Sequence, residues 1–176
     1  YVGALGSSLG EMVANLSANK RGWEERVEKF SSIAKGIDEI RKELLFLVDE
    51  DSNSFDRIMT SFKLPNNSEE EKKIRLKAIY DSSIYAAEVP LRVMNRSYDS
   101  YKLIFELAKN GNQNSISDAG VACLCIHAAI YGAYLNVKIN LKDISNDQGI
   151  LKKADQIIKK SSFERDKILS FIEKVI

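Results

Sequence analysis

The chain has few of the residues that end helices or build covalent and metal sites. Its 176 residues include two prolines, nine glycines, two cysteines and one histidine. The alternation of apolar and polar residues that marks a strand is hard to find, whereas long stretches rich in Lys, Glu, Leu, Ile and Ala favour helices. The sequence therefore predicts an all-α fold. One histidine and two cysteines also form no ligand set at metal spacing, so no metal is expected.

The chain also lacks an excess of positive or negative side chains. Lys and Arg total 26 and Asp and Glu total 25, which gives a formal net charge of +1. Such a chain has no general attraction for nucleic acid or for an anionic membrane surface. With 44% hydrophobic and 29% charged residues, the composition is that of an ordinary globular protein. We expect one domain over residues 1–176, with a small molecule or a protein as its partner.

The two cysteines predict a reducing compartment. Cys123 and Cys125 are two positions apart, so on a helix they point to different sides and cannot bridge each other. Two small residues in the cytoplasm are the simplest interpretation. The uncharged run 119–137 is nearly long enough to span a bilayer, but its histidine, its asparagine and its many alanines make a poor lipid-facing surface. The chain begins with Tyr1 rather than Met, so its native beginning is expected to be absent.

Helical periodicity divides the chain into five segments. Apolar residues recur every three or four positions in 2–19, 23–61, 69–109, 118–137 and 151–172. In the first segment Gly3, Gly6 and Gly10 share a face, which indicates the close approach of a helix, a subunit or a ligand. Pro90 should kink or divide the third segment, because proline removes a backbone donor. Gly111 is predicted to end that segment as a cap.

Residues 110–141 differ from the rest because they carry no charge between Asp118 and Lys138 and are rich in small residues and amides. A helix of this kind must be buried, with other backbones packed closely against it. Its start carries Ser117 and Asp118, and either residue is a suitable N-cap. Amides at the helix ends are costly to bury without partners, so both ends are candidate functional regions. These amides are Asn112, Asn114, Asn136 and Asn140.

Carboxylates set among apolar and amide residues are the best candidates for chemistry, since partial burial can raise the pKa of a carboxyl group towards the range useful for proton transfer. Asp51 shares a helical face with Leu47 and Phe55, which are expected to be buried, although the pattern alone favours a solvated acidic edge. Asp118 has a similar setting and a competing role as a helix cap. His127, among Ala, Cys and Ile, is typical of a core histidine with satisfied hydrogen bonds.

Five motifs taken together resemble a known family. They read LVDEDSNSF, FKLPNNSEEEK, AAEVPL, GNQNSISDAGVA and GAYLNVKINL. In this order and at these separations, between Leu5 and Ile144, they resemble the formiminotransferase-cyclodeaminase C-terminal family. That family includes formimidoyltetrahydrofolate cyclodeaminases and methenyltetrahydrofolate cyclohydrolases. The resemblance implies a homodimeric bundle of long antiparallel helices, with a folate site at or near the subunit interface.

The resemblance also implies roles for single residues. It implies a catalytic aspartate in LVDEDSNSF, for which Asp51 is the first choice and Asp49 the second. The residues implied to line or shape the folate pocket are Gly111, Asn112, Ser117, Asp118, Asn136 and Asn140, with Lys63 and Pro65 at its rim. The family's Gly-rich segment before its first helix is absent from this sequence. Ser54 also replaces the usual Ala, a change that we expect to be tolerated.

The implied activity is that of an ammonia-lyase in folate one-carbon metabolism. It converts 5-formiminotetrahydrofolate to 5,10-methenyltetrahydrofolate and ammonia, with the folate as substrate and without a metal. The first alternative is a methenyltetrahydrofolate cyclohydrolase, which opens the same methenyl bridge with water. The second is a helical dimerisation module that has lost catalysis. The sequence does not separate these three functions.

Overall fold

The protein is a bundle of helices. A computed structural model describes residues 1–147 and 149–176, and every regular element in these ranges is helical. The α-helices are α1 (Val2–Ala18), α2 (Val27–Phe62), α3 (Glu69–Asn110), α4 (Ile116–Asn140) and α5 (Ile150–Val175). Single 3-10 turns, Glu24–Arg26 and Gln113–Ser115, precede α2 and α4. The all-α prediction is confirmed.

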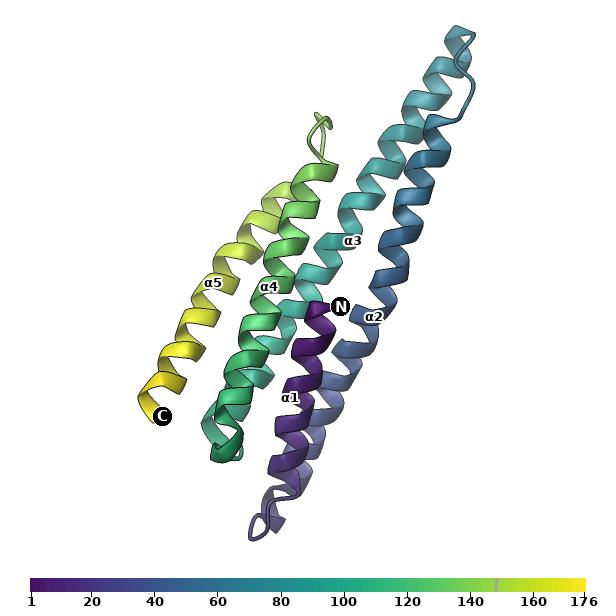
Figure 1. The fold of residues 1–176 in the computed structure, drawn as a ribbon. Coiled ribbons are helices and arrows are strands. Elements are labelled where there is room, and N and C mark those ends of the chain that lie inside the picture. The colour runs from purple at the N-terminus through teal and green to yellow at the C-terminus, as the bar shows by residue number, and fades with distance from the viewer. Residues whose placement is uncertain (148) are drawn as a thin grey trace.

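The helices differ greatly in length, and this difference shapes the molecule. Consecutive helices run in opposite directions, and α1 packs between α2 and α4 (Figure 1). Because α1 has 17 residues and α2 has 36, α1 begins only partway along its neighbour (Figure 1). The α2–α3 hairpin extends well beyond the other helices, and α5 packs against α4 and α3 (Figure 1). Part of α2 therefore has no α1 beside it.

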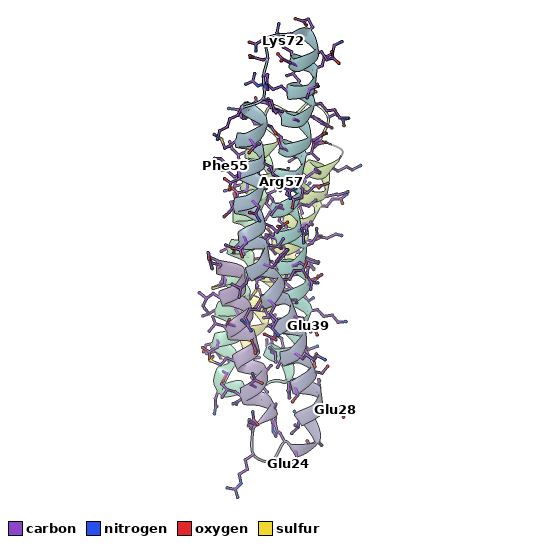
Figure 2. All side chains as sticks on the ribbon, turned by 90° about the vertical axis from the view of Figure 1, so that its right-hand side faces the viewer. Glu24, Glu28, Glu39, Phe55, Arg57 and Lys72 are labelled. Carbon is purple, nitrogen blue, oxygen red and sulfur yellow. The ribbon has the colours of Figure 1, made fainter. Side chains whose placement is uncertain are left out.

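This arrangement corrects one prediction about α2. Leu47 is buried as expected, but Phe55 is 61% exposed. Figure 2 shows Phe55 on the same side of α2 as α1, beyond the point where α1 begins. The apolar face of α2 thus continues past the helix that covers its first half.

Two glycines of α1 lie where other helices come closest. A Cβ on Gly6 would lie 2.9 Å from Cys125 Cβ and 3.0 Å from the backbone oxygen of Ala122 in α4. A Cβ on Gly3 would lie within 3.2 Å of side chains from α2, α3 and α4. Helix packing therefore accounts for these glycines, and they let α1 lie deep between α2 and α4.

Pro90 does not divide α3, which is continuous from Glu69 to Asn110. A proline in a helix leaves the carbonyl four residues earlier without its N–H partner, and here that carbonyl belongs to Ala86. The side-chain nitrogen of Asn140, at the end of α4, donates a hydrogen bond to this oxygen at 2.7 Å. One side chain thus replaces the missing backbone bond and joins the end of α4 to the middle of α3.

The start of α4 also differs from the prediction. Neither Ser117 nor Asp118 caps the helix, because α4 begins at Ile116 with Ser115 in the N-cap position. The Asn112 side chain instead accepts from the Asn114 N–H and organises the preceding 3-10 turn. Asp118 lies in the first turn, where a negative charge is favourable beside the helix N-terminus.

The central helix α4 is buried on part of its surface only. Cys123 is fully buried and Cys125 half-buried, and both thiols are free. Burial raises the pKa of the Cys123 thiol to about 12, so this thiol stays protonated at neutral pH. The segment Gln113–Asn140 is long and apolar enough to cross a membrane, with 39% of its most apolar window buried in the bundle. That α4 serves a soluble bundle stays a prediction.

His127 belongs to a polar network that joins three helices. Arg165 Nη1 of α5 lies 2.7 Å from His127 Nε2, and Ser161 Oγ lies 2.9 Å from His127 Nδ1. Ser161 also lies 2.9 Å from the hydroxyl of Tyr101 in α3. Because a guanidinium only donates, His127 Nε2 must accept, and Nδ1 is then free to donate to Ser161. The histidine is therefore neutral and holds α5 to α3 and α4.

The His127 network predicts acid sensitivity. Burial lowers the pKa of His127 below its ordinary 6.5, and Arg165 lowers it further, while Asp166 acts in the opposite direction. The unfolded chain then binds a proton at higher pH than the folded chain, so this stabilisation is present above pH 6.5 and is lost as the pH falls below it. We expect the Tm to fall by a few degrees more between pH 7.5 and 5.5 in the unmodified protein than in His127→Gln. Equal pH dependence of the two proteins would contradict this assignment.

Candidate functional site

One opening in the described part of the chain lies where α1 begins. It is a groove of about 480 Å³ bounded by the first residues of α1 and by parts of α2, α3 and α4. Its lining is mostly apolar, from residues such as Leu44, Leu47, Val93 and Ala129. The groove is thus the continuation of the space that α1 fills elsewhere between α2 and α4. A volume of this size is within the range of small-molecule sites.

A smaller recess of about 110 Å³ adjoins the groove. Asp51 and Asn136 line both spaces, so the two spaces meet at these residues. The remaining residues of the recess are Ser54, Phe55, Ile58, Ala86 and Asn140. Together the groove and the recess give an elongated site with an apolar part and a polar end.

Asp51 is the carboxylate that faces this site. It is exposed, and among the described residues its carboxylate has no hydrogen bond or ion pair, so it is available to a ligand. Its neighbour Glu50 accepts a hydrogen bond from the Tyr85 hydroxyl, which holds the pKa of Glu50 below its usual value. Asp49, two residues before Asp51, is about 200° away around the helix and lines neither space. The geometry therefore favours Asp51 over Asp49 as the reacting group.

Three of the residues that the resemblance implies as site residues lie close together within this single chain. Asp51, Asn136 and Asn140 line the recess, although the first comes from α2 and the others from α4. Asn136 is exposed, and Asn140 is half-buried and held by the Ala86 carbonyl. These three residues define the candidate site.

The other implied residues lie elsewhere. Along α4, Ser117 and Asn136 are 19 residues apart, which corresponds to about 28 Å. Asp118 lies at the same far end, with Gly111 and Asn112 just before it. One groove in one chain therefore cannot contain both ends of α4. Any role of that far end in binding folate stays a prediction.

Gly111 and Asn112 have a packing role that the structure shows directly. A Cβ on Gly111 would lie 2.4 Å from the backbone oxygen of Leu107 and 3.0 Å from Ser17 Oγ. The Asn112 N–H donates to Ser17 Oγ at 2.8 Å, and Ser17 in turn donates to Val13 at 2.7 Å. This part of the chain fixes the end of α1 against the end of α3.

Lys63 is also distant from the site. It is exposed in the C-cap position of α2, 12 residues after Asp51 and so about 18 Å along the helix. Pro65 follows it in the exposed turn between α2 and α3. The prediction that both residues close the rim of the pocket does not match the groove of this chain.

Sequence reasoning missed three residues that shape the site: Ser54, Ala86 and Pro90. The pairing of Pro90 with Ala86 was available as a signal, because a proline at position 90 frees the carbonyl of residue 86. A buried carbonyl needs a donor, and an amide at the end of a neighbouring helix is a natural one. No pattern in the sequence shows that Ser54, 3% exposed, would line the recess.

Comparisons with known proteins identify relatives of this chain. The sequence profile of the family Formiminotransferase-cyclodeaminase matches residues 1–160. The formimidoyltransferase-cyclodeaminase of Gallus gallus is 34% identical over 145 residues, which cover 82% of this chain and 27% of that protein. The methenyltetrahydrofolate cyclohydrolase of Methylorubrum extorquens is 33% identical over 144 residues, which cover 82% of this chain and 69% of that protein.

A solved structure is similar over almost the whole chain. It is the formiminotetrahydrofolate cyclodeaminase of Thermotoga maritima, with a TM-score of 0.78 and 29% sequence identity. The similarity covers 98% of this chain and 82% of that one. The chain spans only about a quarter of the length of the Gallus gallus relative, so the activities of that whole protein do not transfer directly. The profile match and the cyclohydrolase relative nevertheless show that this chain belongs to the formiminotransferase-cyclodeaminase family.

Proposed function

We propose that the protein is a formimidoyltetrahydrofolate cyclodeaminase that binds its folate in the groove and recess beyond α1. The observation that carries this proposal is the position of Asp51, a free carboxylate at the junction of an apolar groove and a polar recess. The similar Thermotoga maritima structure, which is described as a formiminotetrahydrofolate cyclodeaminase, supports the same activity. Folate has an apolar aromatic part and a polar pterin, which suit the two parts of the site.

The reaction needs one proton to move between two nitrogens. N10 attacks the carbon of the protonated formimino group on N5, and the new C–N10 bond gives a tetrahedral carbon. The proton on N10 passes to the Asp51 carboxylate, which then delivers it to the formimino nitrogen. That C–N bond breaks, ammonia leaves, and the 5,10-methenyl cation remains. Asp51 thus acts as base and then as acid, while the groove holds N10 close to the carbon.

A methenyltetrahydrofolate cyclohydrolase is the second candidate function. The Methylorubrum extorquens relative has this name, and its identity to this chain is nearly that of the Gallus gallus protein. In that reaction water adds to the methenyl carbon, and Asp51 would take the proton that the water gives up. The third candidate is a helical module without catalysis, for which neither the groove nor Asp51 has a chemical role.

We further propose that the protein is a cytoplasmic homodimer that works without a metal. The support for a dimer is a face of exposed apolar residues at spacings of three and four along α4, with others on the adjacent α1. This α1–α4 face consists of Leu5, Met12, Leu16, Val121, Leu124, Tyr131, Leu135 and Ile139. Ala128 lies between Leu124 and Tyr131 on α4 and also lines the groove, so a partner on this face would border the site.

Turnover of two substrates separates the candidate functions. We expect the protein to increase the methenyl absorbance when it is given 5-formiminotetrahydrofolate, because ammonia release leaves the methenyl bridge. Accelerated loss of that absorbance with 5,10-methenyltetrahydrofolate would indicate the cyclohydrolase instead. Absence of both changes, together with no rise in Tm on adding folinic acid, would support the module without catalysis.

Replacing Asp51 tests the catalytic assignment. Asp51→Asn keeps the size of the side chain but removes the base, and general acid–base catalysis typically contributes about 10²–10⁴-fold to a rate. We expect kcat to fall by about 100-fold or more, with little change in Tm because Asp51 is exposed. Asp49→Asn is the matched control and should keep kcat within a few-fold. Full turnover by Asp51→Asn would show that another group moves the proton.

The dimer is tested by a charge in the middle of the α1–α4 face. Leu124→Glu places a carboxylate on an exposed apolar position, so the monomer should fold normally while association weakens. We expect light scattering to give twice the chain mass of 19.8 kDa for the unmodified protein and a single chain mass for the variant. A matched change at an exposed apolar position of α5 that is not part of this face, Phe163→Glu, should leave the mass unchanged. A monomeric unmodified protein would contradict the proposal.

A further inference from the structure

The hydrogen bond between Asn140 and Ala86 fixes which atoms of Asn140 remain free. The Ala86 carbonyl can only accept, so the amide nitrogen of Asn140 must be the atom that faces it at 2.7 Å. The amide oxygen of Asn140 then has no role in this bond. Since Asn140 lines the recess, its oxygen is available there as an acceptor.

Ser54 is constrained in the same way. Its hydroxyl donates to the backbone oxygen of Asp51 at 2.7 Å, which uses its one proton. Ser54 is 3% exposed and lines the recess, so the lone pairs of its hydroxyl oxygen are also acceptors. The Asp51 carboxylate adds two further acceptor oxygens. Asp51, Ser54 and Asn140 therefore present acceptor oxygens to the recess. The Asn136 amide and the second N–H of Asn140 are donors on the same lining, so acceptors predominate there without being the sole polar groups.

A recess in which acceptors predominate suits a ligand edge that consists mainly of donors. Buried acceptors without donors are costly, so a ligand that brings N–H groups gains more there than one that brings oxygens. We propose that the recess takes the donor edge of an aminopyrimidinone ring, which for a folate is the pterin edge with N3–H and the 2-amino group, and that Asn140 and Ser54 determine this orientation. This inference rests on the proposed function, and it adds the direction in which the folate lies.

The orientation places each part of the folate. With the pterin in the recess, the N5 and N10 positions lie beside Asp51, which lines both spaces. The aminobenzoyl ring then lies along the apolar groove towards the beginning of α1, against residues such as Leu47 and Val93. The reverse direction would put the pterin donors among apolar side chains and leave the acceptors of the recess without partners.

A test must separate the packing role of Asn140 from its role towards the ligand. Asn140→Leu alone leaves the Ala86 carbonyl without a donor, which can destabilise the fold. Pro90→Ala restores the N–H four residues after Ala86, so the carbonyl regains its helical partner and no longer needs Asn140. The useful set is therefore Pro90→Ala alone and Pro90→Ala combined with either Asn140→Leu or Asn140→Asp.

Binding of folinic acid is measured by calorimetry for the three variants and the unmodified protein. Pro90→Ala with Asn140→Asp keeps an acceptor oxygen and should bind within a few-fold of Pro90→Ala alone. Pro90→Ala with Asn140→Leu loses the acceptor and should bind about tenfold more weakly or worse. The Tm of both double variants should match that of Pro90→Ala, so a purely structural effect would be visible.

Each other outcome overturns the inference in a distinct way. Equal binding by the Leu and Asp double variants at full strength shows that Asn140 does not contact the ligand. Equal weakening of both shows that Asn140 donates to the ligand and that the recess is not an acceptor site. Either result, with normal turnover of formiminotetrahydrofolate, leaves the proposed function intact. No binding of folinic acid by the unmodified protein, with no turnover, removes the proposed function as well.

Discussion

The candidate site of this protein depends on one hydrogen bond between a side chain and a backbone carbonyl. Pro90 deprives the Ala86 carbonyl of its helical partner, and Asn140 supplies the missing donor from another helix. The bond therefore ties the end of α4 to the middle of α3 where the recess forms, and it fixes the orientation of the Asn140 amide. Pro90 is thus tolerated inside a long helix because Asn140, 50 residues later, donates the hydrogen bond that the proline cannot.

The second constraint is the difference in length between α1 and its neighbours. The glycines of α1 let it fill the space between α2 and α4. Because α1 is short, its first residue lies partway along α2 and α4, and both of these helices extend beyond it (Figure 1). The groove is the part of that space without a helix, which explains why its lining is largely apolar. Asp51 lies on the apolar face of α2 at this boundary. The sequence placed Asp51 on the apolar face of its helix, while its pattern alone favoured a solvated position. In the structure Asp51 lies on that apolar face and is exposed, because no helix covers the face there.

Much of the fold followed from periodicity, because long amphipathic helices repeat their apolar residues over many turns. The ends of the helices depend on local hydrogen bonds that periodicity does not show, and the predicted start of α4 was wrong. A 3-10 turn organised by Asn112 precedes the helix in place of the cap expected from Ser117 or Asp118. The choice of Asp51 came from a family resemblance and agrees with the groove. The resemblance grouped Ser117 and Asn136 in one pocket, although a continuous helix places them about 28 Å apart along one chain. The resemblance also could not place Lys63 away from the pocket, because the hairpin extends beyond its neighbours (Figure 1).

The central claim is that folate binds beyond α1 between α2 and α4, with its pterin at Asn140 and its reacting carbon at Asp51. A crystal structure of the protein with folinic acid tests it most directly. The account predicts the pterin edge within hydrogen-bond distance of the Asn140 oxygen and Ser54, the 5-formyl group beside the Asp51 carboxylate, and the aminobenzoyl ring along the apolar groove. Folinic acid bound instead at the far end of α4, near Asn112 and Asp118, would contradict it.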